Sequence, residues 1–196
     1  MAEPMTALKS LLHRGGAAQE RAGFALYAAA VAAARDPCFF ARLGVPDTLD
    51  GRFDLVAVFA FLLIERLQPA VPPGPELAQK VFDAMFTDMD VTLREIGVGD
   101  LSVGRKVRAM WEAFHGRALA YRAALATPPE DPALEAALAR NVWRGVTPPA
   151  GPPSPPAVGA AAALARIVRA QAAALAGQDL AALAAGNVHF PPSAGL

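Results

Sequence analysis

The densest cluster of polar residues that could carry chemistry lies at residues 87–95. Asp88 and Asp90 are two residues apart, and on an α-helix such side chains project about 200° from each other, so they cannot act as one carboxylate pair or chelate one ion. Asp90 and Arg94 are four residues apart with the acid first, which predicts an ion pair along the helix. Asp88 lies at the edge of an apolar face, where two hypotheses stay open: it caps a neighbouring helix, or it recognises a partner.

The chain has three histidines and one cysteine. His13, His115 and His189 lie far apart and show none of the short spacings that hold a metal ion, and a single cysteine cannot complete a thiolate site. Cys38 is followed by two phenylalanines, which favours a small buried hydrophobic side chain, because a reactive thiolate needs nearby positive charge. These patterns predict a protein without catalytic residues, metal site or cofactor.

Two other functions stay open on the same residues. A helical enzyme could use His115 with Asp88, because a histidine and a carboxylate within hydrogen-bond reach can move protons. A haem-binding helical protein could use His115 as the iron ligand. A pocket that joins His115 to Asp88 would favour the enzyme, and a Soret band that is lost in His115→Ala would favour haem binding.

Three cations, Arg105, Lys106 and Arg108, gather at the predicted start of a helix for which we expect Ser102 to be the N-cap. The helix dipole is positive at that end, so cations in the first turns are unfavourable unless something compensates them. Glu112 follows Arg108 by four residues and compensates it in part. The cluster is interpreted either as a solvated basic face or as a binding site for an acidic partner segment, anionic lipid head groups or RNA.

The composition predicts helices rather than sheets. Hydrophobic residues make up 54% of the 196 residues, but 46 of these are alanine, the best helix former, while Val and Ile together number only 18. Basic residues number 18 and acidic residues 18, so the formal charge is zero, which argues against DNA binding through a large basic surface. We expect an all-α fold.

Proline and glycine positions divide the chain into about six main helices. Before the tail, helices are expected at about residues 17–35, 53–68, 77–96, 102–125 and 133–144. The segment at 53–68 is apolar on all sides, so we expect it to be the buried centre of a helical bundle. Its predicted cap is Asp47 or Asp50.

The chain is predicted to divide into three parts. Residues 17–145 form the helical domain, residues 146–157 a Pro-rich linker, and residues 158–196 an Ala-rich helical tail that docks weakly or on a partner. No run of apolar residues reaches the roughly 18 needed to span a bilayer, and we see no secretory signal. We therefore expect a cytoplasmic protein.

A stripe of methionine and aromatic residues follows helical spacing along two of the predicted helices. Its members are Phe82, Met85, Phe86, Met89, Met110, Trp111 and Phe114. Such a stripe is usually buried core, but methionines and aromatic rings also form adaptable binding surfaces. We expect part of this stripe to line an open cavity.

Four stretches of the chain stand out in their order and spacing. They read GVPDTLDGRFD at residues 44–54, FDAMFTDMDVTLRE at 82–95, GVGDLS at 97–102 and VRAMWEAFHGR at 107–117. Together they resemble the ubiquinol–cytochrome c chaperone family across residues 17–145, and residues 164–191, which close on Val-His-Phe-Pro, resemble the carboxyl end of bacterial members. His115 stands where the resemblance leads us to expect an aromatic residue such as tyrosine.

The resemblance implies an all-helical, non-enzymatic assembly chaperone for respiratory complex III, the ubiquinol–cytochrome c reductase. It implies binding of newly made cytochrome b, with the ribosome or a small partner protein as further contacts, and transient contact with the inner-membrane surface. The residues predicted to bind the client or a partner are Phe82, Met85, Phe86, Asp88, Met89, Asp90, Arg94, Arg105, Lys106, Arg108, Met110, Trp111 and Phe114.

Overall fold

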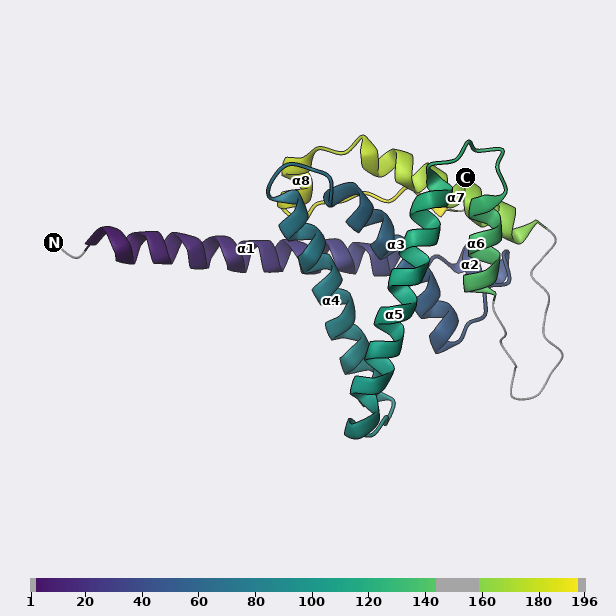
Figure 1. Cartoon of the computed structure of the whole chain (residues 1–196), viewed down its shortest axis with the longest axis horizontal. Coiled ribbons are helices and arrows are strands. Elements are labelled where there is room, and N and C mark those ends of the chain that lie inside the picture. Colours follow the sequence, from purple (N-terminus) through teal and green to yellow (C-terminus); the bar gives the residue numbers. More distant parts are fainter. Residues whose placement is uncertain (1–2, 144–158, 194–196) are drawn as a thin grey trace.

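The computed structural model describes the backbone of residues 3–143 and 159–193, and the side chains of residues 16–143 and 159–193. These ranges hold eight helices and no strand, and six of the helices are ten residues or longer, so the predicted all-α fold is confirmed (Figure 1). The helices are α1 (Glu3–Ala34), α2 (Pro37–Ala41), α3 (Leu49–Leu67), α4 (Gly74–Glu95), α5 (Asp100–Leu125), α6 (Ala133–Val142), α7 (Ala160–Ala176) and α8 (Leu180–Ala184). The predicted linker at residues 146–157 lies outside the described residues.

Helix α3 is the centre of the bundle, as its apolar sequence predicts. Leu55, Phe59 and Leu63 have no exposed surface, and α1, α4 and α7 pack around the helix. The Phe59 ring joins distant parts of the chain, because its centroid lies 5.8 Å from that of Phe39 in α2 and 5.3 Å from that of Phe190 near the carboxyl end. Edge-to-face pairs of this kind stabilise a core beyond the area that they bury.

The cap of α3 is Thr48, so the prediction of Asp47 or Asp50 is wrong. The N–H of Gly51 donates to Thr48 Oγ1 at 3.1 Å, because the extended backbone of Thr48 places its hydroxyl beside the free N–H groups of the first turn. Asp47 instead binds Arg52 Nε at 2.6 Å. Asp50 lies within the first turn, where its charge suits the helix dipole.

The turn between α4 and α5 follows the prediction at one end only. Gly97 ends α4 with a φ of 84°, and its N–H donates to the carbonyl of Arg94 at 3.0 Å. Helix α5 begins at Asp100 with Gly99 as its N-cap, so the predicted cap at Ser102 is wrong. Asp100 puts an acid in the first turn, which favours the earlier start.

Helix α7 belongs to the same core as α3, so the expectation that the tail docks weakly is wrong. Leu164, Val168 and Leu175 are at most 1% exposed. From α3, the guanidinium of Arg66 donates to the carbonyl of Leu175 at 3.0 Å and to that of Gln178 at 2.8 Å, which satisfies carbonyl groups at the end of α7. The small alanines between the leucines let α7 approach α3 and α6 closely.

Helix α1 packs along α3 and α4. Leu26 is fully buried, and Gly23 lies so close to α4 that an added Cβ would stand 2.4 Å from Cβ of Lys80. The stretch Gly16–Ala41 is long and apolar enough to cross a membrane by length and composition, which corrects the expectation of no such segment. Alanines supply much of this hydropathy, and the core helix of a soluble protein meets the same criterion.

Candidate functional site

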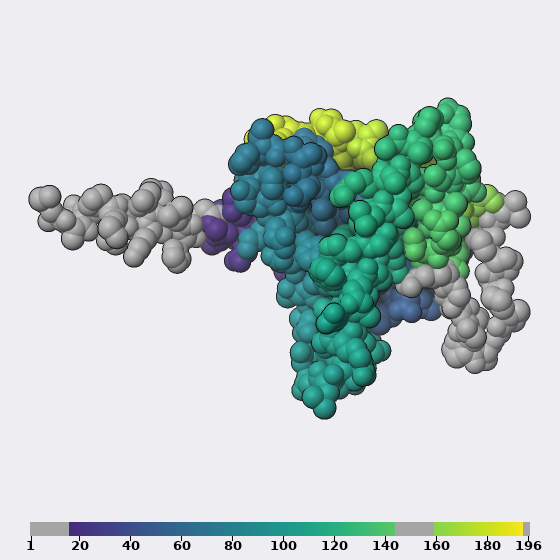
Figure 2. Space-filling view, in the orientation of Figure 1, coloured from purple at the N-terminus to yellow at the C-terminus, as the bar shows by residue number. Residues whose placement is uncertain are grey.

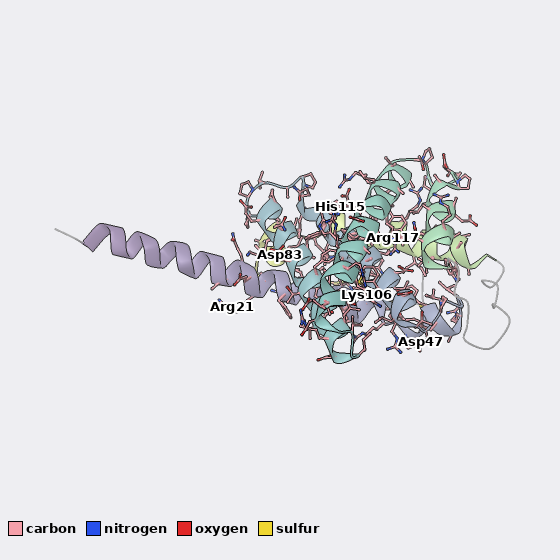
Figure 3. The ribbon with its side chains drawn as sticks, turned by 60° about the horizontal axis from the view of Figure 1, so that its bottom comes forward. Arg21, Asp47, Asp83, Lys106, His115 and Arg117 are labelled. Carbon is pink, nitrogen blue, oxygen red and sulfur yellow. The ribbon has the colours of Figure 1, made fainter. Side chains whose placement is uncertain are left out.

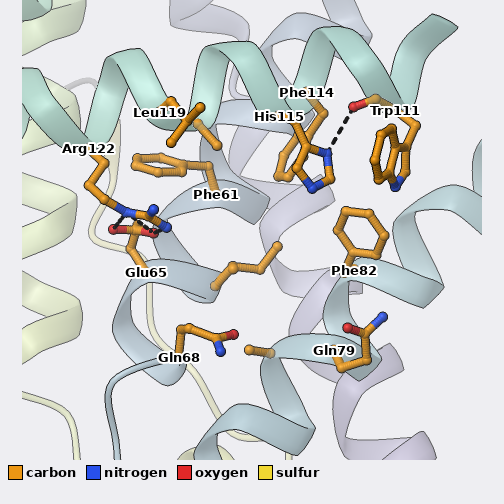
Figure 4. A pocket seen from close by; sticks show the side chains of 13 residues that line it. Phe61, Glu65, Gln68, Gln79, Phe82, Trp111, Phe114, His115, Leu119 and Arg122 are labelled. Carbon is orange, nitrogen blue, oxygen red and sulfur yellow. Dashed lines mark hydrogen bonds and ion pairs between the residues drawn. The ribbon is translucent and has the colours of Figure 1, made fainter. Parts of the chain in front are cut away.

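An open groove of about 410 Å³ lies between α3, α4 and α5 (Figure 4). The three helices supply mostly apolar side chains to it, with a few polar groups at its edge. The lining residues are Phe61, Ile64, Glu65 and Gln68 from α3 and its end, Ala78, Gln79 and Phe82 from α4, and Trp111, Phe114, His115, Ala118, Leu119 and Arg122 from α5.

Helix α5 lines the groove with a second apolar face beside its core stripe. Trp111, His115 and Leu119 are four residues apart, and they lie about 100° round the helix from the core positions Met110 and Phe114. Trp111 keeps 44% of its surface exposed and Leu119 63%. Large apolar side chains exposed on neighbouring turns are typical of a binding surface.

Phe82 lies at the centre of an aromatic cluster that forms one wall of the groove. Its ring centroid is 4.7 Å from that of Phe86 and 5.8 Å from those of Phe114 and His115. The His115 ring also lies tilted against the Trp111 ring, with the centroids 4.0 Å apart, and its Nδ1 lies 3.1 Å from the Trp111 carbonyl oxygen. These contacts hold the rings in place, so the wall is preformed.

Few ionisable groups line the groove. They are Glu65, Arg122 and His115, and the first two bind each other, with Arg122 Nε donating to the two oxygens of Glu65 at 3.0 and 2.8 Å. The hydrogen bond to Glu65 raises the pKa of Arg122. Asp88 is not a lining residue, so this groove does not join His115 to Asp88 as the enzyme alternative requires. The groove can therefore contact a partner through its shape, its apolar surface and the ion pair at its edge.

The predicted apolar stripe is divided between the groove and the core. Phe82, Trp111 and Phe114 line the groove, Phe86 and Met110 are partly buried, and Met85 and Met89 are buried. The two methionines of α4 are on the face that packs into the bundle. They therefore offer almost no surface to a partner while α4 stays in place, since Met85 is 0% and Met89 7% exposed.

Asp88 connects two helices. The hydroxyl of Tyr27 in α1 donates to Asp88 Oδ2 at 2.6 Å, so the carboxylate joins α4 to α1. Burial raises the pKa of Tyr27 above its ordinary value, and the hydrogen bond to Asp88 and its charge raise it further. The predicted pair of Asp90 with Arg94 is present at 2.6 Å, and Arg94 also binds Asp100.

The basic cluster lies in the first part of α5, before the residues of this helix that line the groove. Arg105, Lys106 and Arg108 are exposed, and Arg108 binds Glu112 at 3.0 Å as predicted. Because α5 begins at Asp100, these cations lie beyond its first turn, and the predicted conflict with the helix dipole is weaker than expected. The cations therefore precede the aromatic residues along α5, and Arg108 is one helical turn before Trp111.

A model of the ubiquinol–cytochrome c chaperone family matches residues 41–190, most of the chain. The chain belongs to this family. The predicted resemblance is therefore confirmed. The matched residues include all the residues that line the groove and the two tail helices, α7 and α8. The family match therefore covers the tail together with α3, against which α7 packs.

Two relatives of the ubiquinol–cytochrome c chaperone family show how far the similarity extends. The chain is similar to the crystal structure of the Cbp3 homolog from Brucella abortus, with 33% identity, a TM-score of 0.76, and coverage of 95% of this chain and 98% of that chain. It is also similar to ubiquinol-cytochrome-c reductase complex assembly factor 1 from Xenopus laevis, with 23% identity over 104 residues. That match covers 53% of this chain and about half, 51%, of the frog protein.

Several groove residues of this family member were not predicted as site residues. Phe61 and Ile64 of α3 were expected to be buried core, and Glu65 was not singled out. The pairing of Glu65 with Arg122 joins residues 57 positions apart and leaves no local pattern. Leu119 could have been found, because it continues the spacing of Trp111 on a face that the core stripe does not use.

The single cysteine lies away from the groove and is 8% exposed. Burial, and then the hydrogen bond and charge of Asp36, raise the pKa of the Cys38 thiol to about 11. The thiol therefore stays protonated near neutral pH, which agrees with the predicted role of Cys38 as a small buried hydrophobic side chain.

Proposed function

We propose that this member of the ubiquinol–cytochrome c chaperone family is a non-enzymatic assembly factor that holds an apolar segment of newly made cytochrome b in the groove between α3, α4 and α5. The observation that carries the proposal is an open groove in which Trp111 and Leu119 keep large exposed apolar surfaces. Such surfaces are expected where a soluble protein covers an apolar partner.

The shape and chemistry of the groove suit a helical segment of a membrane protein. An amphipathic or apolar helix binds a groove through side chains on neighbouring turns, and the spacing of Trp111, His115 and Leu119 along α5 offers matching contacts. The pair of Glu65 and Arg122 at the edge gives one polar contact that can orient the segment. Aromatic rings already held in place lower the entropy cost of binding.

The arrangement of ionisable groups supports a binding function rather than a catalytic one. Among the lining residues, Glu65 and Arg122 satisfy each other, and His115 is held by ring contacts with Phe82 and Trp111. Acid–base catalysis needs a proton-transfer partner positioned beside the histidine, and Asp88 is engaged with Tyr27 instead. We extend the proposal to the ribosome or a small partner protein as further contacts, and to a cytoplasmic location.

Photocrosslinking during synthesis tests the client and the groove together. A photoreactive amino acid is placed at position 111 or 119, and at the exposed control position 71, which lies in the turn between α3 and α4. We expect crosslinks to newly made cytochrome b from positions 111 and 119 and none from position 71. Equal crosslinking from all three positions would contradict the groove as the binding site.

Complementation of a deletion strain tests the function itself. We expect deletion of the gene to lower the cytochrome b absorbance of membranes, Val71→Glu to restore it, and Trp111→Glu with Leu119→Glu to fail. Normal complex III in the deletion strain would contradict the whole proposal. A Soret band in the purified protein that disappears in His115→Ala would favour haem binding in its place.

A further inference from the structure

The α4–α5 hairpin projects from the rest of the molecule, and its turn lies at the end of the projection (Figures 1 and 2). We define residues 96–108, the turn and the first part of α5, as the hairpin tip. Val103 is its only buried residue. Figure 3, in which this end comes forward, shows Lys106 on it. A flat partner could therefore meet the hairpin tip first.

The hairpin tip carries exposed apolar side chains, one at the end of α4 and one in the first turn of α5. Leu101 is 99% exposed and Ile96 58% exposed. A Cβ added at Gly97 or Gly99 would meet nothing within 4 Å, so the described chain leaves the turn uncovered. A single exposed leucine is ordinary on a protein surface. Two large aliphatic side chains on a projecting turn can instead leave water together.

Cations follow directly behind these aliphatic side chains. Arg105, Lys106 and Arg108 are exposed, and neither Arg105 nor Lys106 has an ion pair in the described part of the chain, whereas Arg108 binds Glu112. Over residues 96–108, three basic residues and one acidic residue leave a net charge of +2. The hairpin tip is thus positive within a protein whose formal net charge is zero.

We propose that the hairpin tip docks on a membrane surface that contains anionic lipids. Leu101 and Ile96 enter the interfacial layer, and Arg105, Lys106 and Arg108 face the lipid phosphates. An apolar end with a cationic collar matches the two layers that such a surface presents, acyl chains below negative head groups.

The aliphatic side chains favour a membrane over the other anionic partners. RNA and acidic peptides would attract Arg105 and Lys106 equally well, but they offer no apolar phase for Leu101 at the end of the projection. Asp100 does not strongly oppose docking, because Arg94 binds it. The hairpin tip is too short to span a bilayer, which limits the contact to the surface.

Docking at the hairpin tip is independent of the proposed client groove. Leu101 and Trp111, the groove residue nearest to it along α5, are ten residues apart, a distance of about 15 Å at 1.5 Å per residue. A protein docked by its hairpin tip would hold the groove above the lipid surface and open to a client. Either proposal can fail without the other.

Flotation of the purified full-length protein with lipid vesicles tests the inference. The vesicles contain phosphatidylcholine alone, or phosphatidylcholine mixed with phosphatidylglycerol. We expect binding to the mixed vesicles and little to the neutral ones, and we expect it to weaken as salt is added, because salt screens charges beyond about 10 Å at 0.1 M. Absence of binding to the mixed vesicles would overturn the proposal.

Two kinds of variant locate the contact. We expect Arg105→Glu with Lys106→Glu to lower vesicle binding at least about 25-fold, since each cation near an anionic surface is worth about fivefold. We expect Leu101→Asp to remove binding and Leu101→Ala to weaken it. Because Leu101 is 99% exposed, these changes should leave the fold intact, which circular dichroism checks.

Matched controls make the same changes elsewhere. Arg140→Glu with Arg166→Glu reverses two exposed cations, one on α6 and one on α7. Val71→Asp places an acid at the opposite end of α4. Both control variants should bind the vesicles as the unaltered protein does. Normal binding by the hairpin-tip variants would overturn the proposal. So would loss of binding in Phe24→Asp alone, which would assign the contact to α1, or binding of RNA or an acidic peptide in place of vesicles.

Discussion

Asp54 and Arg117 form an ion pair in the core between α3 and α5. Asp54 is 3% exposed and Arg117 5%, and the guanidinium also lies 5.7 Å from the centre of the Phe53 ring. In the sequence, Asp54 marks only the edge of an apolar run. Arg117, which binds Asp54, compensates its charge in the core. The two residues are 63 positions apart, and no local pattern in the sequence connects them.

Asp54→Asn should destabilise the protein strongly. The change removes one charge of a buried pair and leaves Arg117 buried without its counterion, so we expect the free energy of unfolding to fall by about 3–5 kcal/mol. Urea denaturation measures it. Asp47→Asn is the matched control, because the pair of Asp47 with Arg52 is exposed, and its effect should be too small to detect. A loss below about 1 kcal/mol in Asp54→Asn would show that Arg117 finds other stabilisation.

Tyr27 makes stability depend on pH. Burial, and then the hydrogen bond to Asp88 and its charge, raise the pKa of Tyr27 in the folded protein. A raised folded pKa favours the folded state below the ordinary tyrosine pKa of about 10, and this contribution is lost as the pH rises above it. Tyr27 therefore stabilises the protein fully at neutral pH and progressively less at alkaline pH.

Tyr27→Phe should destabilise the protein most at neutral pH. We expect a loss of about 1.5–3 kcal/mol at pH 7, since the hydroxyl donates to a carboxylate. The difference between variant and unaltered protein should shrink above about pH 10, because Phe cannot ionise. Urea denaturation from neutral to alkaline pH measures both, and a difference that is constant with pH would refute the assignment to Tyr27.

Among the helices, α5 shows what a local pattern can and cannot predict. Its end near Leu125 follows from residue spacing and is as predicted. Of the apolar stripe predicted on it, Phe114 is buried, Met110 is partly buried and Trp111 is 44% exposed. Its second apolar face was not predicted, because spacing identifies side chains that share a face but not whether a neighbouring helix covers that face. Phe61 and Ile64 of α3 stop short of covering Trp111 and Leu119, and this gap is the groove.

The prediction that the tail docks weakly rests on the small number of large apolar residues among the alanines of α7. The structure places Leu164 at 0% exposure and Val168 at 1%, against α3 and α6. Few large side chains therefore do not mean weak packing when alanines allow close contact. Burial depends on the helix that lies opposite, which the sequence of α7 alone does not contain.

Leu164→Ala should show that α7 is part of the core. Removing a fully buried leucine side chain leaves a cavity, and we expect the free energy of unfolding to fall by about 2–5 kcal/mol. Arg166→Ala, two residues along the same helix and exposed, should change it little. Equal small effects of both changes, measured by urea denaturation, would restore the view of α7 as a weakly docked tail.

At the scale of the whole molecule, the sequence predicts the helices better than their arrangement. Local periodicity, proline and glycine predict the six long helices, although α1 begins at Glu3 and not near residue 17 as expected. The contacts that arrange these helices join distant residues, as between Tyr27 and Asp88 or Arg66 and Leu175, and depend on geometry that no single segment carries. The groove likewise depends on contacts between distant residues, so the sequence of one helix does not predict it.

The shared core predicts one cooperative unfolding transition for the whole chain. The two tryptophans report different regions: Trp111 lies beside the groove on α5, and Trp143 follows α6 and packs against the core. In Trp111→Phe the fluorescence reports Trp143, and in Trp143→Phe it reports Trp111. In each variant we expect the unfolding transition seen by fluorescence to coincide with the one seen by far-ultraviolet circular dichroism.

The Leu164→Ala change gives a stricter test of a single cooperative unfolding transition. If α7 and α5 unfold together, the change on α7 should move the transition seen by Trp111, although that side chain is on another helix. The midpoint of thermal unfolding should fall by about 2–4 °C for each kcal/mol lost. If only Trp143 responded, or if the two probes gave separate midpoints, the carboxyl-terminal helices would be a unit with its own stability, and client binding in the groove could proceed without them.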